Sequence, residues 1–132
     1  MIGPSPEELA EADHWLREAG EELAVADLIA SDEALPGRVA CFHAHLAAEK
    51  ALKSLQIRRG VVVHKVHNLA ALADELPQGD QQSFDDADLD MVNPWTIDGR
   101  YPADHEEVDR ETVRRVLGAA ARVFAEVCRA AE

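Results

Sequence analysis

Five polar residues stand close together in an otherwise apolar helical stretch. They are His43, His45, Glu49, Lys50 and Lys53. Helical spacing puts Glu49 and Lys53 one turn apart, as an i,i+4 ion pair. Because ammonium and imidazolium groups bind anions, one interpretation is a binding surface made by Lys50 and Lys53 with His43 nearby. The alternative is an ordinary solvated helix face, stabilised by about a few tenths of a kcal/mol.

Several residues of the chain could also form a metal site. His64 and His67, together with His43, Glu49 and Cys41, are residue types that bind zinc. However, the His64-x-x-His67 spacing matches no defined zinc signature, and both residues fall in a predicted loop. We therefore predict no metal site and no cofactor, and assign these residues to packing and helix capping.

The two cysteines fall inside helical patterns, at Cys41 and Cys128. This placement favours buried thiols, and a disulfide between them is the alternative.

Residues 1–6 have neither a basic start nor an apolar segment, so we expect no secretory signal and a cytoplasmic location. No apolar run reaches the roughly 18 residues that a membrane span requires.

Charge is unevenly distributed along the 132 residues, whose net charge is −13. Residues 1–35 carry −9 and residues 68–99 carry −8, whereas residues 36–67 carry +5 and residues 100–132 carry −1. The acidic total argues against a general nucleic-acid binder. The basic segment indicates either a solvated face or a local basic cleft suited to one phosphate or a short RNA.

The polar residues are expected to stand on helices. Ser5, Pro6 and Glu8 form a capping box, and apolar residues at intervals of three and four predict a helix over 6–30. Further helices are predicted over 38–58, from Asn68 to Pro77, from Ser83 to Asn93, and from Asp109 to the C-terminus. Residues 61–63 are predicted to form an extended loop and residues 78–82 a loop.

These elements predict an all-α fold. With no convincing strand and mostly short connections, we expect an antiparallel up-and-down helical bundle of about five helices. The length is sufficient for one core, so residues 1–132 are expected to form a single domain.

Several motifs occur in a specific order. Ala47-Ala48-Glu49-Lys50-Ala51-Leu52-Lys53 is followed by His67-Asn68-Leu69 and then by Arg100-Tyr101-Pro102. This order resembles the HEPN domain family (higher eukaryotes and prokaryotes nucleotide-binding), in its Arg-Tyr-Pro-containing branch. The family often has Gln-Gln ahead of the Ala-Ala-Glu-Lys block, where this chain has His45-Leu46.

The resemblance implies a helical bundle that dimerises and works with a minimal nucleotidyltransferase. It further implies that His43, Glu49, Lys50, Lys53, His67 and Tyr101 bind a nucleotide or RNA. Ribonuclease members of the family use an Arg followed four to six residues later by His. The pair Arg100 and His105 fits, as phosphate clamp and acid–base. Arg38 with His43 or His45, and Arg58 or Arg59 with His64, have similar spacing, but the position ahead of the last helix favours Arg100 and His105.

Three functions follow as alternatives. The first is a nucleotide- or RNA-binding module with a nucleotidyltransferase partner, in a toxin–antitoxin-like or accessory role. The second is a metal-independent endoribonuclease that uses Arg100 and His105. The third is a non-catalytic protein-interaction domain, in which the basic residues form only salt bridges.

Overall fold

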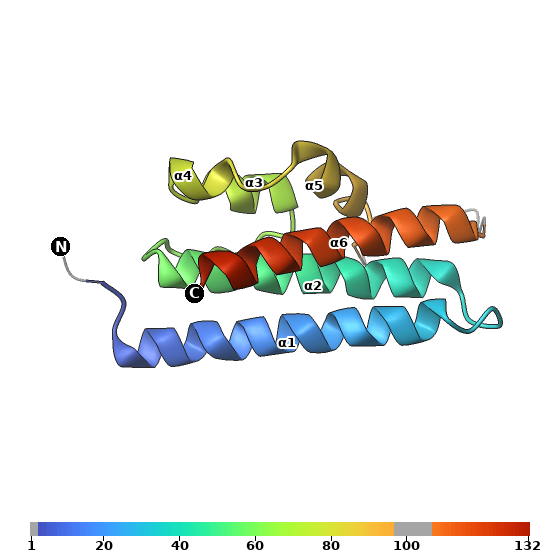
Figure 1. Ribbon diagram of the computed structural model, residues 1–132, viewed down its shortest axis with the longest axis horizontal. Helices are drawn as coiled ribbons and strands as arrows, with labels where there is room; N and C mark the ends of the chain where they lie inside the picture. Colours follow the sequence, from blue (N-terminus) through green and yellow to red (C-terminus); the bar gives the residue numbers. More distant parts are fainter. Residues whose placement is uncertain (1–2, 97–106) are drawn as a thin grey trace.

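Three long helices lie side by side in the computed structural model, which describes residues 3–96 and 107–132 (Figure 1). They are α1 (Pro6–Ala30), α2 (Gly37–Arg58) and α6 (Arg110–Ala130). Three short helices, α3 (Leu69–Asp74), α4 (Gln78–Gln81) and α5 (Asp86–Val92), form a second layer beside α2 and α6. The described ranges contain no strand, and the predicted all-α bundle is confirmed.

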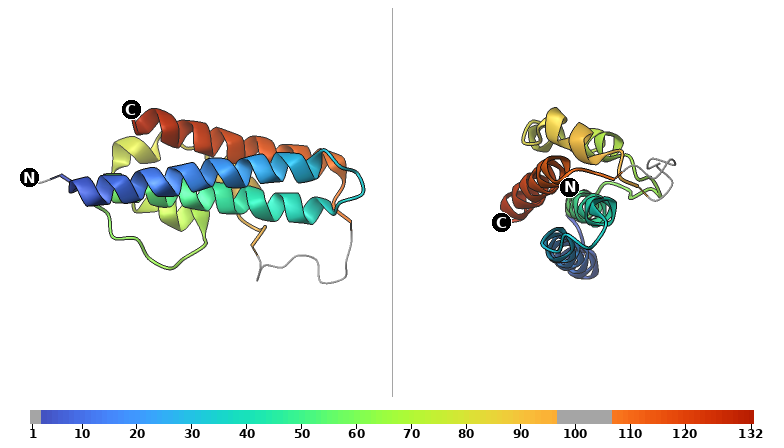
Figure 2. Two further views of the ribbon diagram at one scale, coloured as in Figure 1. Left: turned by 90° about the horizontal axis from the view of Figure 1, so that it is seen from below. Right: turned by 90° about the vertical axis from the view of Figure 1, so that its right-hand side faces the viewer.

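The long helices differ in direction, and the short helices lie on one side of them. α1 and α2 are antiparallel and joined by a short connection, whereas α6 runs in the same direction as α2 (Figures 1 and 2). α4 lies at the end of the bundle where α2 ends, α5 lies further toward the start of α6, and α3 lies between them (Figure 1). The three short helices therefore cover one side of the long ones.

The helix ends follow local rules. Glu8 N–H donates to Ser5 Oγ at 3.1 Å and Ser5 N–H donates to Glu8 Oε1 at 2.8 Å, which is the predicted capping box. Asp109 accepts from the Thr112 N–H at 2.7 Å, as predicted for the last helix. Gly60 ends the second helix at φ +73°, where a Cβ atom would be strained.

α2 is the centre of the bundle, with α1 on one side and α3, α5 and α6 on the others (Figure 2). Its alanines at 44, 47, 48 and 51 are fully buried and allow neighbouring helices to approach closely. Leu52 and Leu55 fill the core beside them. Burying a polar side chain on such a helix costs free energy unless that side chain has a hydrogen-bonding partner.

Two details differ from the sequence expectations. Residues Gln78–Gln81, predicted as a loop, form the single-turn helix α4, and Gln81 Nε2 donates to the carbonyl oxygens of Asp74 and Leu76. Cys41 and Cys128 are both free thiols, but only Cys41 is buried. Burial raises the pKa of the Cys41 thiol to about 12, so this group is unreactive at neutral pH. No described helix has the length and apolar content for a membrane span.

Candidate functional site

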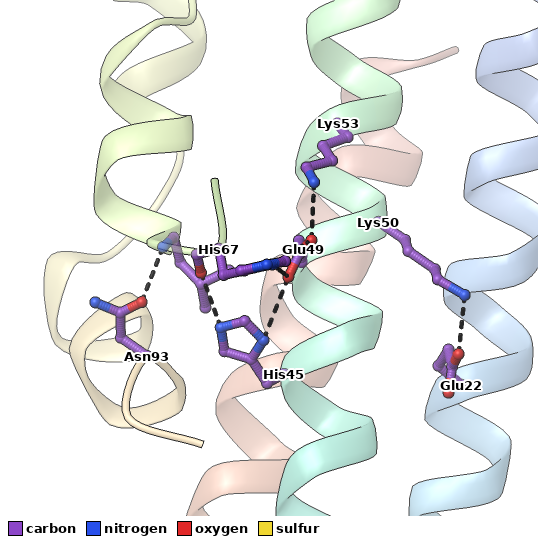
Figure 3. Close-up of polar contacts among 8 residues, drawn as sticks. Glu22, His45, Glu49, Lys50, Lys53, His67 and Asn93 are labelled. Atoms are coloured by element: carbon purple, nitrogen blue, oxygen red, sulfur yellow. Dashed lines mark hydrogen bonds and ion pairs between the residues drawn. The ribbon is translucent and has the colours of Figure 1, made fainter. Parts of the chain in front are cut away.

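The polar residues of α2 fall into two clusters on different sides of the helix. The α1 cluster consists of His43 and Lys50 with Glu18 and Glu22 of α1. The His67 cluster consists of His45, Glu49 and Lys53 with His67, which precedes α3. Figure 3 shows Lys50 reaching toward Glu22 on one side and Glu49 meeting His67 on the other. The single surface expected from His43, Lys50 and Lys53 is therefore corrected to two separate clusters.

The α1 cluster ties two helices together. Lys50 Nζ lies 3.0 Å from Glu18 Oε1 and 2.9 Å from Glu22 Oε2. Hydrogen bonding to Lys50 lowers the pKa of Glu18. Burial opposes the ionisation of Glu22, but its hydrogen bonds with Lys50 and His43 prevail and lower its pKa. Burial likewise disfavours charged Lys50, but the two carboxylates prevail and raise its pKa.

His43 completes the α1 cluster, since its Nδ1 lies 2.7 Å from Glu22 Oε1. His43 and Lys50 are both partly buried between the helices. Each of the four side chains in this cluster is therefore paired with another one. The cluster therefore acts as an interhelical ion-pair network.

The His67 cluster is built on a buried ion pair. Glu49 and Lys53 are each only 6 % exposed, and Lys53 Nζ donates to Glu49 Oε2 at 2.8 Å. Lys53 Nζ also lies 5.8 Å from the centre of the Trp15 ring, a cation–π distance. The expected i,i+4 pair is confirmed, but the alternative of an ordinary solvated face is wrong for Glu49 and Lys53.

His67 meets this pair from another part of the chain. Its Nδ1 lies 3.0 and 3.1 Å from the two carboxylate oxygens of Glu49. Because an ionised carboxylate only accepts hydrogen bonds, Nδ1 carries the proton and Nε2 is left free of this contact. The His67 side chain is 62 % exposed, so the ring is fixed at one edge and open to solvent.

The backbone around His67 is held as firmly as its ring. His45, 1 % exposed, donates from Nε2 to the His67 carbonyl oxygen at 2.9 Å. The next residue, Asn68, caps α3 by accepting from the Ala71 N–H, and Asn93 Oδ1 accepts from the Leu69 N–H (Figure 3). Burial lowers the pKa of His45, despite the nearby Glu49 carboxylate, so this imidazole is neutral at pH 7. These contacts fix the position of His67 before any ligand binds.

Pairs of a carboxylate and an imidazole in this arrangement occur in many functional sites. The carboxylate sets the tautomer and orientation of the ring, and the outer nitrogen exchanges protons or contacts an anion. Sequence reasoning selected Glu49, Lys53 and His67 but left His45 out of the site. The one local signal for His45 was its position four residues before Glu49.

The remaining predicted residues are Arg100, Tyr101 and His105. They lie outside the described ranges 3–96 and 107–132, so their roles stay predictions. Within those ranges, no group of three or more His, Cys, Asp or Glu side chains is arranged to hold a metal ion.

Of the two interpretations of the basic segment 36–67, a local basic cleft must take account of the acidic partners that the structure gives to four of its six basic residues. Lys50 and Lys53 are occupied by the carboxylates described above. Arg58 pairs with Asp13, and Arg59 Nε donates to Asp80 Oδ2 at 2.7 Å. Acidic residues of the neighbouring segments therefore neutralise much of the local positive charge.

A groove of about 960 Å³ lies elsewhere, between the end of α1, the α1–α2 connection and the start of α6. Its lining includes the apolar residues Leu35, Val113 and Leu117. None of the predicted site residues in the described ranges lines this groove. Among the predicted site residues that the structure describes, His67 has the most exposed side chain.

Solved structures with the same fold support the architecture. An archaeal HEPN homologue, ST0689, superposes with a TM-score of 0.71 at 20 % identity, covering 92 % of this chain and 98 % of its own. TT1696 from Thermus thermophilus superposes with a TM-score of 0.56 at 27 % identity, covering 93 % and 94 % of the two chains. No functionally curated protein matches the sequence. The HEPN domain model matches residues 12–130, nearly the whole sequence, and the chain therefore belongs to the HEPN domain family.

Proposed function

We propose that this chain is a nucleotide- or RNA-binding HEPN module whose ligand contacts the His67 cluster. One observation carries the proposal: an exposed imidazole is fixed by a carboxylate that is itself buried beside a lysine. Packing alone gives no reason to bury Glu49 and Lys53, because burying an ion pair is often no better than burying apolar residues of similar volume. The arrangement supports binding, for which a fixed polar group costs little ordering entropy.

The roles of the predicted binding residues differ in this proposal. His67 is the group that meets the ligand, because its side chain is exposed. Glu49, which is held by Lys53, sets the orientation of the His67 ring. His43 and Lys50 maintain the α1–α2 packing, and Tyr101 remains a predicted contact.

Titration of a labelled single-stranded RNA and of ATP tests this function. We expect His67→Ala to weaken binding about tenfold, the loss of roughly 1.4 kcal/mol. His64→Ala is the matched control, because His64 belongs to the same loop, is 57 % exposed, and has its carboxylate neighbour Glu75 at 3.7 Å. Equal affinity of the two variants would overturn this placement of the ligand. Absence of any binding by the wild type would favour the interaction-domain alternative.

The same purified protein and RNA also test the alternative of a catalytic role. Incubation of single-stranded RNA with the protein in EDTA tests for a metal-independent endoribonuclease. Cleavage that persists in EDTA and disappears in Arg100→Ala and His105→Ala would favour the enzyme, and intact RNA at high protein concentration would contradict it.

The partners proposed for this chain are a second copy of itself and a minimal nucleotidyltransferase, in a toxin–antitoxin-like or accessory role in the cytoplasm. Membership of the HEPN family supports this part of the proposal. Light scattering on the purified chain tests the dimer. Co-purification with the product of a neighbouring nucleotidyltransferase reading frame tests the partner.

A further inference from the structure

We infer that the His67 cluster binds a phosphodiester through a doubly protonated His67, so that RNA binding is coupled to the uptake of a proton. This inference rests on the proposed function and deepens it, because it names the group of the ligand and the state of the protein that contacts it.

The first step is the tautomer. Glu49 accepts from Nδ1 of His67 at 3.0 Å, so Nδ1 keeps its proton in both charge states. In the neutral ring, Nε2 therefore presents a lone pair, which repels a phosphate oxygen. Only the doubly protonated ring presents an N–H donor at Nε2. A phosphate contact at this nitrogen consequently requires a second proton.

The second step is the charge balance. The carboxylate of Glu49 already has a cationic partner in Lys53, whose Nζ lies at 2.8 Å. The pair as a whole is neutral, so protonation of His67 gives the cluster one net positive charge. Without Lys53, the same proton would merely neutralise Glu49. The buried lysine thus lets the exposed imidazole attract an anion.

The third step is the surroundings of the ring. Within residues 3–96 and 107–132, the charged or titratable groups joined to the ring directly or through Glu49 come from α2: Glu49 directly, with Lys53 and His45 behind it. Burial keeps His45 neutral at pH 7, so this group adds no opposing charge. At the neighbouring start of α3 and end of α5 stand Asn68 and Asn93, which are uncharged. The coupling is therefore assigned to His67 itself.

Isothermal titration calorimetry with a five-nucleotide RNA that lacks terminal phosphates tests the coupling between RNA binding and proton uptake. Its phosphodiesters do not titrate between pH 6 and 8, so every proton exchanged belongs to the protein. Titrations at one pH, in buffers with different ionisation enthalpies, count the protons taken up. We expect net proton uptake on binding, and an affinity that falls by up to about tenfold for each unit of increasing pH.

Two variants assign the proton. His67→Gln keeps a donor for Glu49 but cannot gain a proton, so proton uptake and the pH dependence are expected to disappear. His64→Gln is the control and is expected to keep both. The free nucleoside, which has no phosphate, is expected not to bind.

The outcomes separate this inference from the proposed function. RNA binding without proton uptake, or with uptake that survives His67→Gln, overturns the inference and leaves RNA binding standing. Binding of the nucleoside as tightly as RNA overturns the phosphodiester contact. No binding of RNA at any pH overturns both proposals.

Discussion

The two polar clusters of α2 contain similar groups but differ in which of these groups is exposed. The α1 cluster and the His67 cluster each combine imidazole, ammonium and carboxylate groups, with most of the atoms at hydrogen-bonding distance. In the α1 cluster both partners stand on long helices, and the imidazole is held between them. In the His67 cluster the imidazole comes from the connection before α3 and is exposed.

Under the proposed function, residue type does not distinguish a structural ion pair from a binding group. What distinguishes them is which member of the cluster is exposed. In the α1 cluster Glu18, the member most exposed, is held by Lys50 and flanked by His14. In the His67 cluster the ion pair is buried, and a ring that Glu49 holds only through Nδ1 reaches solvent. The predictions below test whether stability and binding separate along this line.

The largest expected effect concerns the buried pair. Glu49→Gln keeps the side-chain shape but leaves Lys53 charged and without a counter-ion, which costs about 3–5 kcal/mol for a buried pair. Glu22→Gln in the α1 cluster is the matched control, because Lys50 keeps Glu18 as a partner; its expected cost is about 1 kcal/mol. Urea denaturation at pH 7 measures both. Equal losses would contradict the distinction between the clusters.

The second effect is the acid sensitivity of folding. Because burial lowers the pKa of His45 below its ordinary 6.5, the unfolded chain binds a proton that the folded chain does not. The free energy of unfolding therefore falls as the pH decreases below about 6.5, by at most about 1.4 kcal/mol for each pH unit.

The α1 cluster titrates in a different window. The pKa values of Glu18 and Glu22 are lowered from 4.5, so their contribution is present above that pH and lost as the pH falls through the folded-state values. Urea denaturation from pH 7 to pH 3 separates the two clusters. His45→Gln is expected to remove the slope just below pH 6.5, and Lys50→Met the steepest part below pH 4.5. If His45→Gln instead removed the slope below pH 4.5, and Lys50→Met the slope just below pH 6.5, this assignment of the two pH windows would be wrong.

The third effect is small and salt-dependent. Lys50→Met removes a partly exposed ammonium group and retains the apolar stem, so the expected cost is about 1 kcal/mol or less. Because the pairs with Glu18 and Glu22 are accessible to ions, 1 M NaCl is expected to reduce the difference between wild type and variant. Urea denaturation at low and high salt measures it. A loss of unfolding free energy as large as that expected for Glu49→Gln would contradict the view that the ion pairs of the α1 cluster are the weaker, solvent-accessible ones.

The fold was largely predictable because its signals are local. The Ser5 capping box, the Asn68 and Asp109 caps and the apolar spacing of the long helices each act within one or two turns. Helix α4 was missed because four residues that include Gly79 give no periodic pattern, and Pro77 before them is typical of a loop.

The site was less predictable because its decisive contacts are not local. Glu49 and Lys53 are a local pair, but lysine is rarely buried, and nothing in the spacing shows that both lie beneath the surface. The contact between Glu49 and His67 crosses a loop whose path depends on how α3 docks against α2 and α5. The partner of Lys50 depends on the register between α1 and α2, which packing of the whole helices sets.

The smallest expected effect on stability is the most informative one for function. His67→Ala removes an exposed ring while Glu49 keeps Lys53, so the free energy of unfolding is expected to change by about 0.5 kcal/mol or less. His43→Ala removes a ring held between two helices by Glu22 and is expected to lower stability more. RNA affinity is expected to respond in the opposite order, with a loss for His67→Ala and none for His43→Ala. Measuring both quantities on both variants tests the comparison directly, because two structural histidines would change stability alone. If His43→Ala weakened RNA binding while His67→Ala did not, the ligand would belong on the α1 side of α2.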